Sequence, residues 1–244
     1  MFLMYRIPVY AHRGASAYAF ENTIQAFEKA IELGADGIEI DIQLTKDGIP
    51  IIFHDLNLRR LTGSRKRVNE LPFEKVMKKK IGKPFRRLFH GEKIMSLKEM
   101  IEWAGNRKIG LNIELKESLM REPQFVKEIV KRCRHLTDVH FSSFHYELLE
   151  VIKSQFPKME TAYILTKESD WGNLKRYVAA DAFHLHKRNY KPEKLELLWK
   201  SGKKIRFYGV VGNEPFIATP HPIVKGWITD FPDAVLERQA MPQT

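Results

Sequence analysis

The feature that most constrains the fold is a regular succession of strand-like and helix-like segments. Short apolar or alternating stretches are followed by segments whose apolar residues recur at helical spacing. The expected strands are 7–11, 37–45, 49–53, 109–115, 138–142, 161–165, 182–186, 204–211 and 226–229, and the expected helices are 23–33, 96–104, 123–134, 146–155, 171–178, 192–201 and 232–239. Asn22 is the expected cap of the first helix and Ser96 that of the second. Such alternation predicts an α/β fold with a parallel sheet, and about eight units that close on themselves make a TIM (β/α)8 barrel.

The chain length suits one barrel domain that spans residues 1–244. An open, doubly wound sheet is the alternative, but no glycine-rich phosphate-binding fingerprint follows the first strand. After the second strand and its returning arm, residues 56–95 interrupt the succession with glycines, two prolines and runs of lysine and arginine. We expect a small basic insertion there, largely irregular, with one short helix near 73–80.

The net charge of +11 is concentrated in one segment, residues 59–98, which we call the basic segment. It contains 14 Lys and Arg against three Glu, so the rest of the chain is balanced. This excess indicates an anionic partner, such as a phosphate-bearing small molecule, an anionic membrane surface or a polymer. The alternative is a solvated lysine-rich excursion. Aromatic residues are not interleaved at regular intervals, so we do not expect nucleic-acid binding.

The remaining composition points to a cytoplasmic protein. The single cysteine, Cys133, excludes an intramolecular disulfide and favours a reducing compartment. No apolar run approaches the roughly 18 residues needed to span a membrane. The stretch Met1–Pro8 is too short for a signal peptide with a cleavage site.

The segment Gly37–Thr45 alternates apolar and polar residues and reads as a strand. Its polar face carries Glu39 and Asp41, two residues apart and about 7 Å from each other along a strand. Two carboxylates that close are unfavourable without a positive partner, and a divalent cation with oxygen ligands is one such partner. The alternative is an exposed edge strand whose acids are solvated.

Further reactive side chains lie where predicted strands end, which in a barrel is the face that carries the active site. They are His12, Arg13, His54, Asp55, Glu114, Lys116 and Asp230. Glu114 can join Glu39 and Asp41 in an oxygen-ligand site that favours Mg²⁺ or Ca²⁺ over Zn²⁺. Arg13 and Lys116 suit phosphate binding, and the two histidines suit acid–base chemistry.

Each of these residues also has a purely structural interpretation. Glu114 and Lys116 can form a plain ion pair, and Asp55 can orient His54 or cap a turn. Other histidines are interpreted without a role in the chemistry. His184 and His186 are expected in the core or at the barrel mouth, and His140 and His145 on the surface or in loops.

An ordered set of motifs resembles the glycerophosphodiester phosphodiesterase family over nearly the whole chain. The motifs are Ala-His-Arg-Gly at 11–14, Glu-Asn-Thr at 21–23, Gly-Ile-Glu-Ile-Asp-Ile at 37–42, His-Asp at 54–55, Asn-Ile-Glu-Leu-Lys at 112–116, Ser-Phe at 143–144 and Thr-Asp-Phe-Pro at 229–232. Each motif alone is weak, whereas the ordered set is specific. Two stretches depart from the family pattern. Residues 208–211 read Tyr-Gly-Val-Val in place of a Trp-Thr-Val-Asn-like run, and Met95-Ser96 stands in place of Pro-Thr.

The resemblance implies a TIM barrel with a small insertion after the second strand. It implies that the chain hydrolyses glycerophosphodiesters to sn-glycerol 3-phosphate and an alcohol. The implied metal ligands are Glu39, Asp41 and Glu114, the acid–base pair is His12 and His54, and the phosphate-binding groups are Arg13 and Lys116. The roles of the two histidines and the nucleophile, water or a neighbouring glycerol hydroxyl, stay open. Two alternative hypotheses are a phosphodiester lyase that stops at a cyclic phosphate and a non-catalytic anion-binding protein.

Overall fold

A computed structural model describes residues 6–85 and 87–241. Residues 1–5, 86 and 242–244 lie outside the described residues. They include most of the stretch interpreted above as too short for a signal peptide, one arginine of the basic segment and the end of the predicted domain 1–244.

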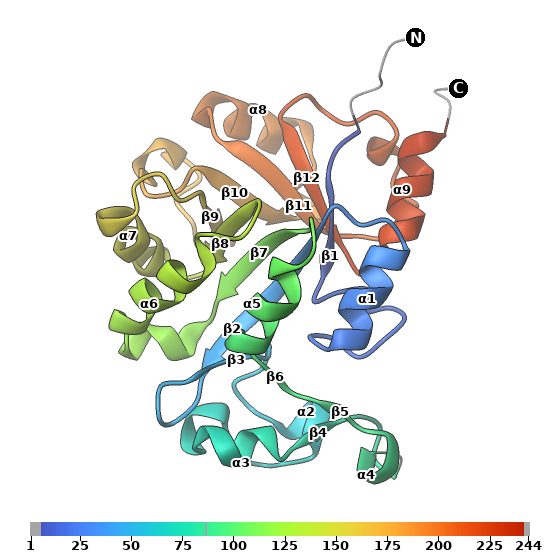
Figure 1. The fold of residues 1–244 in the computed structure, drawn as a ribbon. Helices are drawn as coiled ribbons and strands as arrows, with labels where there is room; N and C mark the ends of the chain where they lie inside the picture. Colours follow the sequence, from blue (N-terminus) through green and yellow to red (C-terminus); the bar gives the residue numbers. More distant parts are fainter. Residues whose placement is uncertain (1–5, 86, 242–244) are drawn as a thin grey trace.

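Twelve strands and nine helices occur in the described part of the chain (Figure 1). The strands are β1 Val9–His12, β2 Gly37–Leu44, β3 Pro50–Ile52, β4 Lys80–Ile81, β5 Glu92–Lys93, β6 Met95–Ser96, β7 Gly110–Leu115, β8 Val139–Ser143, β9 Thr161–Ile164, β10 Ala182–His186, β11 Lys204–Val210 and β12 Val224–Thr229. The helices are α1 Ile24–Glu32, α2 Arg59–Thr62, α3 Phe73–Met77, α4 Arg87–His90, α5 Leu97–Gly105, α6 Gln124–Cys133, α7 Tyr146–Gln155, α8 Pro192–Ser201 and α9 Pro232–Ala240.

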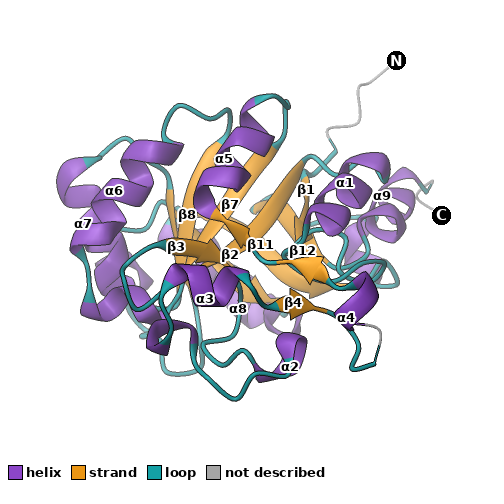
Figure 2. Cartoon of the chain, turned by 60° about the horizontal axis from the view of Figure 1, so that its bottom comes forward, coloured by secondary structure: helices purple, strands orange, loops and turns teal. Residues whose placement is uncertain are grey.

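Eight parallel strands close into the predicted TIM barrel. Each of β1, β2, β7, β8, β9, β10, β11 and β12 pairs in parallel with the next, and β12 pairs with β1. The helices lie around the outside of this barrel (Figures 1 and 2). Closure excludes the open doubly wound sheet. It also places the carboxyl ends of all eight strands at one mouth.

The side chains of strand β2 alternate between the helix layer and the barrel interior. All eight of its residues are buried, because β1 and β7 flank it on either side. Ile38, Ile40 and Ile42 belong to the apolar cluster that the surrounding helices share. The alternate residues, Glu39 and Asp41, therefore face the barrel interior. The alternative of an exposed edge strand with solvated acids is wrong.

Most predicted helices are present with small changes at their ends. Helix α1 is capped by Thr23, whose side chain accepts a hydrogen bond from Ala26 N–H, and not by Asn22 as the sequence suggested. Ser96 caps α5 as predicted. The expected helix at 171–178 is wrong, because this stretch forms only a short 3₁₀ turn at Leu174–Arg176. Three other 3₁₀ turns follow strands at Glu117–Arg121, Lys187–Asn189 and Pro215–Ile217.

The chain between β3 and α5 forms a lobe at the end of the barrel toward which β2 points (Figure 1). We call residues 56–96 the lobe. It contains α2, a 3₁₀ turn at Val68–Glu70, α3, α4 and the β4–β5 pair. A small apolar cluster joins it to the chain at β3, and consists of Ile51, Phe53, Leu58, Leu61, Val68, Val76, Ile81 and Ile94. The short helix predicted near 73–80 is α3. The expectation that the rest would be irregular is wrong, because α2, α4 and the β4–β5 pair also form there. Among the described residues no helix has the length and apolar character needed to cross a membrane.

Candidate active site

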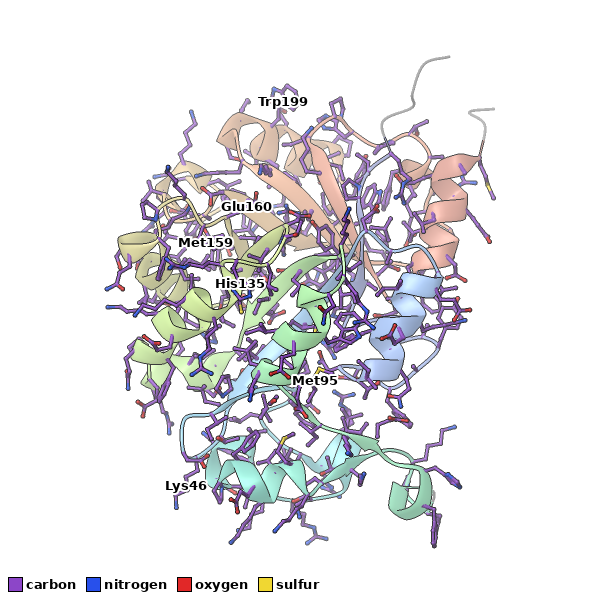
Figure 3. The ribbon with its side chains drawn as sticks, viewed as in Figure 1. Lys46, Met95, His135, Met159, Glu160 and Trp199 are labelled. Atoms are coloured by element: carbon purple, nitrogen blue, oxygen red, sulfur yellow. The ribbon has the colours of Figure 1, made fainter. Side chains whose placement is uncertain are left out.

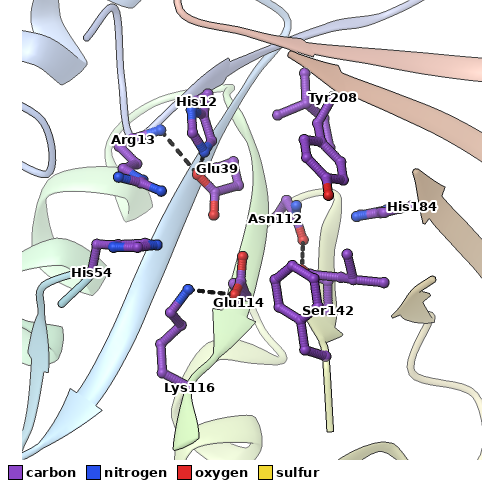
Figure 4. A pocket seen from close by; sticks show the side chains of 13 residues that line it. His12, Arg13, Glu39, His54, Asn112, Glu114, Lys116, Ser142, His184 and Tyr208 are labelled. Carbon is purple, nitrogen blue, oxygen red and sulfur yellow. Dashed lines mark hydrogen bonds and ion pairs between the residues drawn. The ribbon is translucent and has the colours of Figure 1, made fainter. Parts of the chain in front are cut away.

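A pocket opens at the carboxyl ends of the barrel strands (Figure 4). The predicted acid–base, phosphate-binding and metal-ligating residues line it except Asp41, which is fully buried next to Glu39 and Glu114. The predicted strand-end residues Asp55 and Asp230 do not line it. The lining residues are His12, Arg13, Glu39, His54, Asn112, Glu114, Lys116, Ser142, Phe144, Ile164, His184, Tyr208 and Ile228. Residues that are up to 216 positions apart in sequence, from His12 to Ile228, thus meet in one place.

Three carboxylates meet at the mouth because of the strand register. Asp41 on β2 is paired with Glu114 on β7, and Glu39 lies two residues before Asp41 on the same face. One oxygen from each of the three lies within 4.8 Å of the others, and all three side chains are buried. This cluster has the oxygen-only donors that Mg²⁺ and Ca²⁺ prefer.

The negative charge of the carboxylate cluster is only partly compensated by the side chains around it, which supports a cation site. Glu39 Oε1 is buried and has no hydrogen-bond partner among the described residues. Burial raises the pKa of Glu39 to about 8, with a further contribution from the neighbouring charge of Asp41. Burial, followed by the charge of Asp41, also raises the pKa of Glu114. Without a cation, the cluster therefore favours protonation of its glutamates, and a divalent ion would remove this cost.

Two cationic side chains flank the cluster. Lys116 Nζ lies 2.6 Å from Glu114 Oε1 and 3.2 Å from Asp41 Oδ1. Arg13 Nε lies 3.1 Å from Asp41 Oδ2, and its Nη1 donates to Glu21 at 2.9 Å. Arg13 has a left-handed backbone with φ +57°, and its backbone N–H donates to Glu39. The plain Glu114–Lys116 ion pair exists, yet both groups also line the pocket.

Both predicted histidines are oriented by a carboxylate. Asp230 Oδ1 lies 2.7 Å from Nδ1 of His12, and Asp55 Oδ1 lies 2.7 Å from Nδ1 of His54. An ionised carboxylate can only accept a hydrogen bond, so Nδ1 of each ring carries a proton and Nε2 is the nitrogen left free to take one up. His12 Nε2 lies 4.0 Å from Glu39.

The two histidines differ in the direction of their pKa shifts. Burial lowers the pKa of His12, but the hydrogen bond to Asp230 and the charge of Glu39 outweigh it, so the net shift is upward. Burial lowers the pKa of His54. The negative charge of Asp41 raises this pKa, but the positive charges of Lys116 and Arg13 lower it further, so the net shift is downward. The metal-free site thus holds two imidazoles with opposite shifts.

Asn22 is a site residue that the sequence interpretation misplaced. Its backbone is left-handed with φ +56°, so its side chain turns away from the helix that it was expected to cap. Its Nδ2 donates to Asp41 Oδ2 at 2.8 Å. The Glu-Asn-Thr motif marked this position, but only the fold brings it to the carboxylate.

The inner wall of the pocket was also missed. Ser142 Oγ donates to Asn112 Oδ1 at 2.8 Å, and His184 Nε2 is buried without a hydrogen-bond partner among the described residues. Burial and Arg206 lower the pKa of His184 well below its usual value, so its imidazole is neutral. In Figure 4 the ring lies at the pocket edge beside Tyr208. The period-two pattern had placed His184 in the core or at the mouth, and both are correct.

His140 is the one histidine whose interpretation is wrong. It was expected on the surface or in a loop, but it lies inside the barrel on β8, fully enclosed. Its ring contacts those of Tyr10 and His184 edge-on, at centroid distances of 5.3 and 5.7 Å. The error arises because an inward position on a barrel strand is buried whatever its polarity.

Comparison with known proteins gives consistent relatives. The family model described as the glycerophosphoryl diester phosphodiesterase family matches residues 12–234. A glycerophosphodiester phosphodiesterase of Caldanaerobacter subterraneus subsp. tengcongensis is 34% identical over 233 residues, covering 93% of this chain and 96% of that protein.

Solved structures agree with the sequence relatives. A phosphodiesterase from Oleispira antarctica, in complex with the product sn-glycerol-3-phosphate, has a TM-score of 0.83 and 26% identity, and the match covers 96% of this chain and 97% of that one. A glycerophosphodiester phosphodiesterase from Thermotoga maritima has a TM-score of 0.75 and 27% identity, with 95% and 98% covered. The barrel, its pocket and these matches agree, and the chain belongs to the glycerophosphoryl diester phosphodiesterase family.

Proposed function

We propose that this protein hydrolyses glycerophosphodiesters to sn-glycerol 3-phosphate and an alcohol, with the help of a divalent cation. The observation that carries the proposal is the carboxylate cluster of Glu39, Asp41 and Glu114. It lies at one pocket together with two basic side chains and two histidines that are each oriented by a carboxylate. The name of the Oleispira antarctica relative, which includes the product sn-glycerol-3-phosphate, supports this substrate class. We further propose one catalytic domain over residues 1–244, with a basic insertion at about 56–95, in the cytoplasm.

Glu39, Asp41 and Glu114 are proposed to hold the cation, which is Mg²⁺ or Ca²⁺. When bound, it would supply positive charge that polarises the phosphodiester. The unpartnered Glu39 Oε1 and the raised pKa of both glutamates fit such an ion. Asn22 would then hold one oxygen of Asp41 in place through its hydrogen bond.

Arg13 and Lys116 are proposed to bind the phosphate oxygens. Burial of each side chain lowers its pKa. The negative charge of Asp41 raises the pKa of both and is the largest effect in that direction, so the net pKa shift of each is upward. They therefore stay charged throughout the physiological pH range. Two fixed cations at the phosphate stabilise the charge that builds up as the reaction proceeds.

His12 and His54 are proposed to transfer the protons. One imidazole takes a proton from the attacking oxygen as the new P–O bond forms. The other gives a proton to the leaving alcohol oxygen as its bond to phosphorus breaks. The attacking oxygen is that of water or of the neighbouring glycerol hydroxyl. The hydroxyl route passes through a cyclic phosphate that water then opens, whereas a lyase would release the cyclic phosphate.

The test is release of sn-glycerol 3-phosphate from glycerophosphocholine and glycerophosphoethanolamine with Mg²⁺, with Ca²⁺ and with EDTA. We expect cation-dependent release, and the difference between the two cations identifies the better metal. Accumulation of cyclic phosphate would support the lyase instead. Binding of substrate without any turnover under either cation would support the anion-binding protein.

Substitution of the histidines tests the site itself. We expect His12→Ala and His54→Ala each to lower kcat by about 10²-fold or more, since each removes a proton-transfer group. His135→Ala is the matched control, because this exposed histidine lies on a different part of the molecule (Figure 3). Full activity in both site variants would refute the assignment.

A further inference from the structure

The basic segment presents an unusual number of unpaired cations. Among its described side chains, only Arg60 and Lys98 form ion pairs with acidic groups. Lys75, Lys78, Lys83 and Lys93 are exposed. Free surface cations in one region create a positive potential that attracts an anionic partner.

Two phenylalanines of the same lobe are also exposed. Phe85 and Phe89 are 95% and 83% exposed, the highest values for any large apolar side chain in the described part of the chain. Phe85 lies two residues after Lys83, and Phe89 belongs to α4, which contacts β4. Exposed aromatic rings cost free energy in water, so their presence indicates a surface that binds apolar material.

The lobe lies at the same end of the molecule as the pocket. Figure 1 shows α4 and the β4–β5 pair below the barrel, at the end toward which β2 points. Figure 2 shows α2, α3, β4 and α4 in front of the barrel when this end is turned forward. Arg60 of α2 ties the lobe to the site, since it binds Asp55 and Glu21, the partners of His54 and Arg13. A surface that contacts the lobe therefore lies near the pocket.

We propose that Phe85, Phe89 and the exposed lysines of the lobe dock the protein onto a lipid bilayer with anionic headgroups. The lysines meet the headgroups and the two rings enter the interface, a combination that membrane-surface segments use. A soluble polyanion would account for the lysines but leave the exposed rings without a role. This interaction goes beyond the proposed catalysis and does not depend on it, since docking needs no turnover.

The test is co-sedimentation of the full chain with vesicles of phosphatidylcholine alone or mixed with phosphatidylglycerol. We expect binding to the mixed vesicles only, and weaker binding as salt rises. Phe85→Ala/Phe89→Ala should weaken binding about 10-fold or more. Lys83→Glu/Lys93→Glu should weaken it about 25-fold or more, since each basic residue near the surface contributes a factor of about 5.

Matched controls carry the same chemical changes at the opposite end of the molecule. Trp199→Ala removes an exposed aromatic residue far from the lobe (Figure 3), and Lys158→Glu reverses an exposed lysine next to Met159. Both controls should bind as the unchanged protein does, and thermal unfolding should verify that every variant is folded. Binding to phosphatidylcholine vesicles that is as strong as binding to the mixed vesicles would overturn the proposal. An unchanged affinity of Phe85→Ala/Phe89→Ala for the mixed vesicles would overturn it too. Binding to heparin without binding to vesicles would identify a soluble polyanion as the partner and overturn it too.

Discussion

At the scale of single residues, the contact between Asn22 and Asp41 joins a backbone conformation to the proposed cation site. Asn22 is left-handed with φ +56°, and its amide donates to Asp41 at 2.8 Å. Asparagine tolerates this conformation better than most residues, and glycine tolerates it best. Substitution by alanine and by glycine therefore separates the backbone from the side chain.

We expect Asn22→Ala to lower the free energy of unfolding by about 2 kcal/mol, because a hydrogen bond to a carboxylate is lost and the left-handed backbone becomes strained. Asn22→Gly should be the more stable of the two variants. Both should weaken Mg²⁺ or Ca²⁺ binding about 10-fold to 100-fold, since neither can hold Asp41. Urea unfolding and calorimetric metal titration measure the two effects. Normal metal affinity in the glycine variant would contradict a supporting role for the amide.

Glu39 makes the stability of the metal-free protein depend on pH. Its pKa rises from 4.5 to about 8 on folding, first because of burial and second because of Asp41. The folded chain therefore binds more protons than the unfolded chain between these values, and the free energy of unfolding falls as pH rises from 4.5 to about 8. We expect the free energy of unfolding of Glu39→Gln to fall less steeply with pH than that of the unchanged protein across this range. Urea unfolding in the presence of EDTA measures both slopes. Identical slopes would refute the shift.

At the scale of elements, the sequence predicted the strands well and their connections less well. Each barrel strand buries alternate residues on two faces, so short apolar or alternating stretches located the strands to within about two residues. The stretch 171–178 looked helical from its apolar spacing. Gly172 and Asn173 disfavour a helix there, and Asp170 N–H instead donates to the Tyr177 hydroxyl at 2.8 Å. Such a contact depends on how the chain folds back and is not visible in the spacing.

The start of α5 offers a test of a predicted cap. Ser96 Oγ accepts from Glu99 N–H at 3.2 Å, and Glu99 Oε2 accepts from Ser96 N–H at 2.8 Å. We expect Ser96→Ala to lower the free energy of unfolding by about 1 kcal/mol, because both reciprocal bonds are weakened. Ser154→Ala, at an exposed position near the end of α7, should change it by less than about 0.5 kcal/mol. Equal urea midpoints for the two variants would show that the cap contributes nothing.

At the scale of the whole molecule, closure of the barrel decides which polar side chains become buried. Glu39 and Asp41 were identified from the alternating pattern within one strand, and Glu114 from its place near the end of another, because the barrel mouth brings these positions together. His140 and Arg206 were not identified as interior groups. Their strands are covered on one face by helices and closed on the other by the barrel, so local alternation does not tell the two faces apart.

A partly buried ion pair between Arg206 and Glu160 lies at the end of the barrel opposite the pocket. Arg206 is buried on β11, and its Nη2 donates to Glu160 at 2.6 Å, while its Nε and Nη1 have no hydrogen-bond partner among the described residues. Glu160 also pairs with the more exposed Lys204. Burial of an arginine is tolerated only while a counter-charge is present.

We therefore expect Glu160→Gln to lower the free energy of unfolding by about 2 kcal/mol, less than for a fully buried pair because solvent reaches Glu160. Glu160→Gln/Arg206→Met should recover most of this loss, since no uncompensated buried charge remains. Lys204→Met is the matched control and should cost less than about 0.5 kcal/mol. Urea unfolding of the three variants measures the effect, and turnover should be unchanged because the pair lies away from the pocket. A double variant as unstable as Glu160→Gln would mean that Glu160 stabilises the barrel by packing and not by charge.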